Sequence, residues 1–205
     1  ANKSGTFLLK KTMTQTTTPV HIFWFRRDLR LEDNHGLYQA LSAGLPVLPI
    51  FIFDTTILDQ LTDKKDARVA FIHHSLVQLD ETLRRQGSGL HVLHGSPASC
   101  FAKLLQEYTV RGVYTNHDYE PYAQERDAAI AQMLSQANAS FYTYKDQVIF
   151  EKDEVLKDDG KPYTVFTPYS RKWKQRLANE GISQFSSEAN LSSFISYACL
   201  LYTSP

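Results

Sequence analysis

Charged side chains follow three apolar runs of the sequence, at the points where those runs end. Arg27 follows HIFWF, Asp54 follows VLPIFIF, and Asp118 and Glu120 follow GVYTN. A guanidinium donates hydrogen bonds to carbonyl or phosphate oxygens, and a carboxylate accepts them from the N–H groups of a heterocycle. The residue types therefore suit a planar, polar ligand held by side chains. Neither GxGxxG nor GxxxxGK[ST] occurs, so a dinucleotide fingerprint and a phosphate loop are not predicted.

A second interpretation of the first charged segment is purely structural. Its charged side chains could pair with one another across a solvated loop, and residue chemistry alone slightly favours this interpretation. The side chains concerned are Arg26, Arg27, Asp28, Arg30, Glu32 and Asp33.

Metal binding and nucleophilic catalysis are not predicted. His91 and His94 are an odd number of positions apart on a predicted strand and so face opposite sides, while His73 and His74 are adjacent on a predicted helix. Cys100 lies beside the apolar stripe of its helix and is interpreted as a small buried side chain. We therefore expect no metal site and no catalytic residue.

Composition excludes several other classes of protein. The chain has 205 residues, of which 42% are hydrophobic, and its 22 basic and 22 acidic residues give no net charge. A packed core is expected, whereas the strong positive field of an independent nucleic-acid-binding protein is absent. Two cysteines without a CxxC pair indicate a reducing, cytoplasmic location. The apolar run at 45–53 is far shorter than the roughly 20 residues of a membrane span, so no membrane association is predicted.

The hydrophobic pattern predicts an α/β fold. Short apolar runs rich in β-branched and aromatic residues alternate with amphipathic stretches, which is typical of a Rossmann-like open parallel sheet with helices on both faces. The longest predicted helix runs over 66–86, with apolar residues three and four positions apart. The five predicted strands are 21–25, 47–53, 90–94, 112–116 and 141–144.

The chain is divided into four segments by these patterns. Residues 1–18 lack periodicity and are interpreted as a disordered or non-native extension ahead of the α/β domain at 19–150. Residues 151–190, with an Asp-Gly turn signal and a basic helix around Trp173, predict a connector and the start of a helical domain outside this chain. That basic helix face either contacts phosphates or is simply solvated. Residues 191–205 lose the pattern and are interpreted as a non-native tail.

Four segments in the same order resemble signature segments of the DNA photolyase and cryptochrome family. They are WFRRDLRLEDNHGL at 24–37, DARVAF at 66–71, NHDYEPYAQERD at 116–127 and KPYTVFTPYSRKW at 161–173. The resemblance covers about Pro19 to Asn190 and implies the N-terminal antenna domain of that family. It also implies FAD and damaged DNA as ligands of the helical domain outside this chain, with light-driven repair of pyrimidine dimers by the full-length, monomeric protein.

The antenna pigment implied by the resemblance is of the deazaflavin or flavin type. Arg27, Asp54, Arg68, Asp118 and Glu120 fall where that class has its cofactor-binding pocket. Members that bind methenyltetrahydrofolate have an adjacent Asn-Glu pair where this sequence has Tyr122-Ala123, so a folate antenna is disfavoured. An empty pocket, a cryptochrome-type photoreceptor and an unrelated nucleotide-binding module remain as alternatives. The fragment by itself is expected to be inactive in repair.

Overall fold

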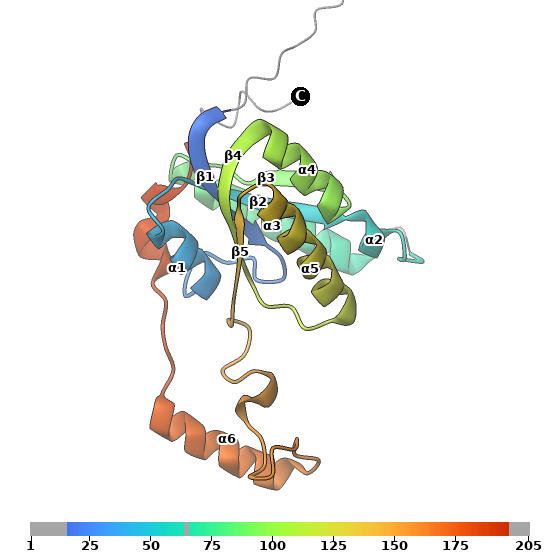
Figure 1. The fold of residues 1–205 in the computed structure, drawn as a ribbon, viewed down its shortest axis with the longest axis vertical. Coiled ribbons are helices and arrows are strands. Elements are labelled where there is room, and N and C mark those ends of the chain that lie inside the picture. The colour runs from blue at the N-terminus through green and yellow to red at the C-terminus, as the bar shows by residue number, and fades with distance from the viewer. Residues whose placement is uncertain (1–15, 64–65, 197–205) are drawn as a thin grey trace, which may run out of the picture.

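The computed structural model describes residues 16–63 and 66–196. The elements alternate between strands and helices through the first two thirds of the chain, as the hydrophobic pattern predicts (Figure 1). In chain order they are β1 (Thr16–Phe25), α1 (His35–Ser42), β2 (Val47–Asp54), α2 (Thr55–Leu58), α3 (Ala67–Arg85), β3 (His91–Gly95), α4 (Pro97–Glu107), β4 (Tyr108–Asn116), α5 (Pro121–Gln136), β5 (Ser140–Tyr144), the 3₁₀ helix η1 (Lys152–Glu154), α6 (Phe166–Glu180) and the 3₁₀ helix η2 (Ser187–Ser193).

The strands form one five-stranded sheet in the order β3-β2-β1-β4-β5, with every neighbouring pair parallel. Phe23 in the central strand is paired with Pro49 of β2 and Tyr114 of β4. Pro49 is accommodated in a central strand although it has no N–H group to donate. The predicted Rossmann-like parallel fold is therefore confirmed.

Two hydrophobic cores lie on opposite faces of this sheet. Side chains of β1 alternate between them, so Ile22 and Trp24 contribute to one core while Phe23 and Phe25 contribute to the other. Helices α4 and α5 cover the first core, and α1 and α3 cover the second, which gives the three-layer arrangement of Figure 1. Cys100 is buried in the first core, where burial raises the pKa of its thiol.

Helix α3 is packed over only part of its length. Asp66 caps its first turn by accepting a hydrogen bond from the Arg68 N–H at 2.8 Å, in agreement with the predicted start. Leu76, Leu79 and Leu83 are buried, and they are the C-terminal part of the predicted stripe. Phe71, nearer the N-terminus, is 71% exposed. The first turns of α3 therefore extend beyond the cover that the sheet provides.

The segment after β5 leaves the sheet and later returns to it. The Asp159-Gly160 signal forms a turn, in which Lys157 N–H donates to the Lys161 carbonyl at 2.9 Å, but no strand flanks the turn. Helix α6 has no buried residue and lies apart from the sheet in Figure 1.

The returning segment is anchored on β2. Phe194 forms an isolated bridge with Val47, and Phe194 and Ile195 are buried in the two cores. The predicted segment boundary at 190 stays a prediction. Strand β1 begins at Thr16, inside the predicted extension, and residues 197–205 of the predicted tail lie outside the described residues. Within the described ranges, no helix is both long and apolar enough to cross a membrane.

Gly36→Ala is expected to lower the free energy of unfolding by about 1–3 kcal/mol, because overpacking outweighs the better helix propensity of alanine. A Cβ at Gly36 would lie 2.6 Å from the Asn116 Oδ1 atom and 3.2 Å from both the Phe23 ring and the Thr115 backbone. Urea unfolding measures the change. Ser42→Ala, at an exposed position of the same helix, is the control, and equal stability of the two variants would contradict this packing.

Candidate functional site

The side chains that could bind a ligand lie where the helices that follow two neighbouring strands go to opposite faces of the sheet. Strands β1 and β4 are neighbours, but α1 after β1 covers one face and α5 after β4 covers the other. In open α/β sheets this divergence opens a crevice beyond the carboxyl ends of the two strands, where ligands bind. Residues 26–28 and 117–120 directly follow these two strands, so they lie at this carboxyl edge of the sheet.

The inner part of the crevice holds a buried ion-pair cluster. Arg26 donates both of its terminal nitrogens to the Asp127 carboxylate, at 2.9 and 2.7 Å, and Arg126 contacts the same carboxylate at 3.1 Å. Both guanidinium groups lie over the Trp24 ring, with centroid distances of 4.1 and 4.9 Å. Burial lowers the pKa of Arg26, but a guanidinium remains charged in proteins. The cluster therefore places fixed charges beneath the crevice.

The outer part brings together three of the five predicted binding residues. Arg27 contacts Glu120 at 2.6 Å and Asp118 at 3.6 Å. Asp118 is only 9% exposed in its side chain, whereas Arg27 and Glu120 are 54% and 63% exposed. The hydrogen bond that Arg27 donates to Glu120 raises the pKa of Arg27. The alternative interpretation had the charged side chains of residues 26–33 pairing with one another. The ion pairs of Arg26, Arg27 and Arg30 are instead with Asp127, with Asp118 and Glu120, and with Asp146, all far away in the chain.

Asp54 is joined to this group through Tyr122. The Asp54 side chain caps α2 by accepting from the Thr56 N–H at 2.9 Å, and it also accepts the Tyr122 hydroxyl at 2.6 Å. Burial, and then the bond to Asp54, raise the pKa of Tyr122. Arg126 lies 5.7 Å from the Tyr122 ring centroid, which connects Asp54 to the buried cluster. Sequence reasoning did not assign Tyr122 a binding role, because the acceptor that it reaches is 68 positions away.

Arg68 is not brought into contact with the other predicted residues. Its guanidinium pairs with Asp66 at 2.6 Å, and its side chain is 77% exposed. The pairing lowers the pKa of Asp66 to about 2. Arg68 lies in the first turn of α3, which covers the opposite face of the sheet from α5, although both helices begin at the carboxyl edge. Its role in binding therefore stays a prediction.

A buried hydrogen-bond network joins the end of β4 to the residues that follow β1. Asn116 donates to the Asn34 Oδ1 atom at 2.9 Å and to the Asp28 carboxylate, and it accepts the Gly36 N–H at 2.8 Å. Asn34 caps α1 by accepting the Leu37 N–H at 3.1 Å. Burial raises the pKa of Asp28. Sequence reasoning missed this network, because Asn116 and its partners are 80 to 88 positions apart in the chain.

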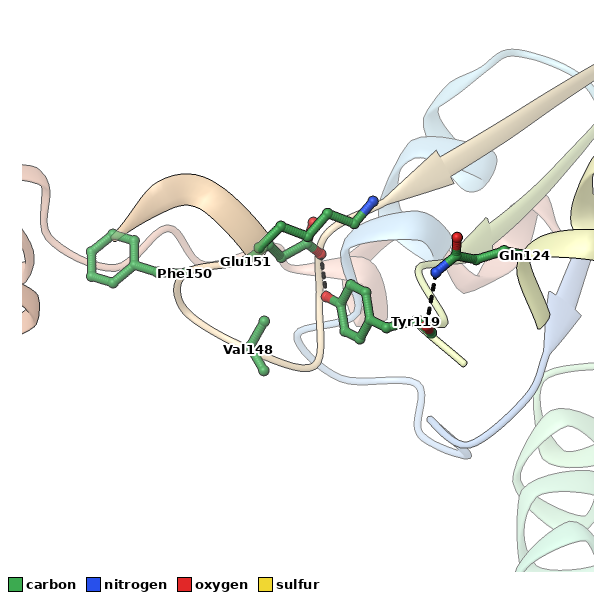
Figure 2. A pocket seen from close by; sticks show the side chains of 6 residues that line it. Tyr119, Gln124, Val148, Phe150 and Glu151 are labelled. Atoms are coloured by element: carbon green, nitrogen blue, oxygen red, sulfur yellow. Dashed lines mark hydrogen bonds between the residues drawn. The ribbon is translucent and has the colours of Figure 1, made fainter. Parts of the chain in front are cut away.

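The β4–α5 loop also borders a hollow on the side of the connector. The Glu151 carboxylate contacts His117 Nδ1 at 2.8 Å and accepts the Tyr119 hydroxyl at 2.5 Å. Figure 2 shows Tyr119 between Glu151 and Gln124, and Val148 also lines this hollow. The cavity measures about 570 Å³. These contacts attach the connector to the α/β domain.

Comparison with known proteins decides the family. The family model described as DNA photolyase matches residues 21–187. This chain belongs to the DNA photolyase family. The resemblance seen in the four sequence segments is thereby confirmed.

Individual photolyases and cryptochromes show the same relationship. The deoxyribodipyrimidine photo-lyase of Synechococcus sp. (strain ATCC 27144 / PCC 6301 / SAUG 1402/1) is 36% identical over 153 residues, which are 75% of this chain and 31% of that protein. Cryptochrome-1 of Gallus gallus is 30% identical over 139 residues, which are 68% of this chain and 22% of the length of that cryptochrome.

A solved photolyase structure has the same fold. The archaeal photolyase from Sulfolobus tokodaii superposes with a TM-score of 0.65 and 27% identity, covering 86% of this chain and 42% of that one. It was described as holding two FAD molecules, with the implication of a novel light-harvesting cofactor. The chain spans between about a fifth and two fifths of the length of these relatives.

Proposed function

We propose that this chain is the light-harvesting domain of a deoxyribodipyrimidine photo-lyase, whose remaining part holds FAD and repairs cyclobutane pyrimidine dimers in DNA. The observation that carries the proposal is the grouping of Arg27, Asp118 and Glu120 at the crevice between β1 and β4. The photo-lyase relatives and the light-harvesting cofactor described for the Sulfolobus tokodaii protein support it.

The residues at the crevice fit a deazaflavin or flavin pigment. Its ring carbonyls need donors, which Arg27 and Arg126 supply, and its N–H and hydroxyl groups need acceptors, which Asp118 and Glu120 supply. When bound, such a pigment absorbs light and transfers the excitation to FAD. The chain's own residues hold and orient the pigment, and they require no acid–base chemistry.

A folate antenna fits less well. The two positions at which the folate-type resemblance requires Asn and Glu are Tyr122 and Ala123. The Tyr122 hydroxyl donates to Asp54, and Ala123 is 2% exposed and has no polar side chain. Neither residue offers the free carboxylate or amide that the folate pattern needs.

The proposed partners follow from the same assignment. Damaged DNA is contacted by the part of the protein outside this chain, which agrees with the zero net charge of the sequence. We propose a monomer that acts in the cytoplasm.

Repair by the full-length protein tests the proposed activity. Reduced and loaded with FAD, it is expected to restore dimer-containing DNA under near-UV or blue light. The alternative is a cryptochrome-type photoreceptor, which the 30% identity to the Gallus gallus protein favours. A fully reduced, FAD-loaded protein that repairs nothing would support the photoreceptor, and repair in the dark would support neither.

Asp118→Asn and Arg68→Ala are each expected to remove the absorbance of the antenna pigment while repair under strong light is kept. The reason is that the pigment raises only the capture of photons, whereas FAD performs the repair. Arg171→Ala, at an exposed position of α6, is the control. Unchanged absorption spectra in both variants would mean that the pigment binds elsewhere. A loss of pigment absorbance in Asp118→Asn alone would mean that Arg68 is not part of the binding pocket.

A further inference from the structure

The β4–α5 loop divides its side chains between two sets of partners. Asp118 and Glu120 form the ion pairs of the candidate site. His117 and Tyr119, which alternate with them in the sequence, contact the Glu151 carboxylate of the connector instead, at 2.8 and 2.5 Å. Figure 2 shows the contact of Tyr119 with Glu151. Four consecutive residues therefore join the candidate site to the connector.

Glu151 is well placed to hold this loop. Its side chain is 10% exposed, and both of its carboxylate oxygens lie 2.8 Å from His117 Nδ1. An ionised carboxylate only accepts hydrogen bonds, so His117 Nδ1 carries the hydrogen, whether the imidazole ring is neutral or charged. Burial, and then the bond to Glu151, raise the pKa of Tyr119, so its hydroxyl remains a donor. Both contacts therefore persist over the physiological pH range.

The turn that carries Glu151 is also bonded to α6. The Glu151 N–H donates to the Glu154 carboxylate at 2.5 Å, and Lys145, just after β5, donates to the same carboxylate at 2.9 Å. Arg176 of α6 donates to the Glu154 carbonyl, and its guanidinium lies 3.9 Å from the Glu154 carboxylate. Polar contacts therefore continue from the β4–α5 loop through Glu151 and Glu154 to α6.

We infer that Glu151 is a positioning residue for the transfer of excitation energy, an inference that rests on the proposed function. By holding the β4–α5 loop against the connector, Glu151 fixes Asp118 and Glu120 relative to α6. Transfer between two pigments depends on their distance and mutual orientation, so a pigment held by this loop requires the loop to be fixed toward the part of the protein that holds FAD. Glu151 acts through the loop and is not one of the residues proposed to hold the pigment.

Hydrogen exchange of the 205-residue chain, followed by NMR, tests the attachment without any pigment. The reporter is the His117 N–H, which donates to the Tyr144 carbonyl at 2.8 Å. Glu151→Ala removes the charged acceptor of two hydrogen bonds, so this N–H is expected to exchange at least about tenfold faster. Glu151→Gln keeps an acceptor and is expected to stay within about threefold of the wild type.

Asp153→Ala, which removes an exposed carboxylate from the same turn, is the matched control and is expected to leave the exchange unchanged. Unchanged exchange in Glu151→Ala would overturn the inference while leaving the proposed function intact. Circular dichroism establishes that Glu151→Ala folds. If it does not fold, Tyr119→Phe, which keeps the ring and removes the hydroxyl donor, replaces it with the same expected direction.

The full-length protein, loaded with FAD and a flavin or deazaflavin pigment, tests the role in energy transfer. Quenching of pigment fluorescence measures the transfer efficiency at equal pigment occupancy. Glu151→Ala is expected to lower this efficiency at least about twofold, and Glu151→Gln to restore it, with repair under strong light unchanged in both. Equal efficiency in the wild type and Glu151→Ala, or an equal loss in Glu151→Gln, would overturn the inference. If the wild type binds no pigment, the proposed function and the inference both fail.

Discussion

Asn116→Ala is expected to lower the free energy of unfolding by about 2–4 kcal/mol, since each buried polar group left without a partner costs about 1–3 kcal/mol. Asn116 is 1% exposed. Its amide satisfies the Gly36 N–H, the Asn34 side chain and the Asp28 carboxylate together. The alanine variant leaves these groups buried without this partner, and chemical denaturation measures the loss.

Asn179→Ala is the control for this prediction, because Asn179 is exposed near the end of α6. A change within about 0.5 kcal/mol is expected there. If the two alanine variants are equally stable, the amide network does not hold the carboxyl edge of the sheet.

Arg26→Met is expected to lower the free energy of unfolding by about 3–5 kcal/mol, the usual result of removing one partner from a buried ion pair. The Arg26 and Asp127 side chains are 6% and 16% exposed, and two hydrogen bonds join them. Without Arg26, the Asp127 carboxylate keeps only its contact with Arg126. Thermal unfolding at neutral pH measures the effect.

The double variant Arg26→Met with Asp127→Leu separates the effect of the ion pair on stability from the effect of side-chain packing. Replacing both charges by apolar groups of similar size removes the unpaired carboxylate, so the double variant is expected to be more stable than Arg26→Met alone. A double variant less stable than either single one would show that the two charges act independently.

The sheet could be predicted from the sequence because its strands are buried on both faces. Such strands appear as short apolar runs, and the predicted run 47–53 differs from β2, Val47–Asp54, by one residue. The stripe of leucines in α3 and its Asp66 cap were likewise local patterns. The start of β4 was missed, since the strand begins at Tyr108 and not at residue 112.

The candidate site was only partly predictable, for a physical reason. Parallel strands bring their carboxyl ends to one edge, which is why Arg27, Asp118 and Glu120 could be grouped before the fold was known. Which side chains then touch depends on partners far apart in the chain, such as Arg26 and Asp127, separated by 101 positions. The Asp66–Arg68 pair shows the opposite case. Arg68 was predicted to face the site, but its charge is paired with a residue only two positions away.

The action spectrum for DNA repair by the full-length protein tests most directly whether this domain harvests light. Wild-type protein and Asp118→Asn are compared after loading with FAD and a flavin or deazaflavin pigment, at limiting light. We expect a repair band that follows pigment absorption in the wild type and is lost in the variant, with FAD-driven repair unchanged. Identical action spectra for the two proteins, each following FAD alone, would contradict it.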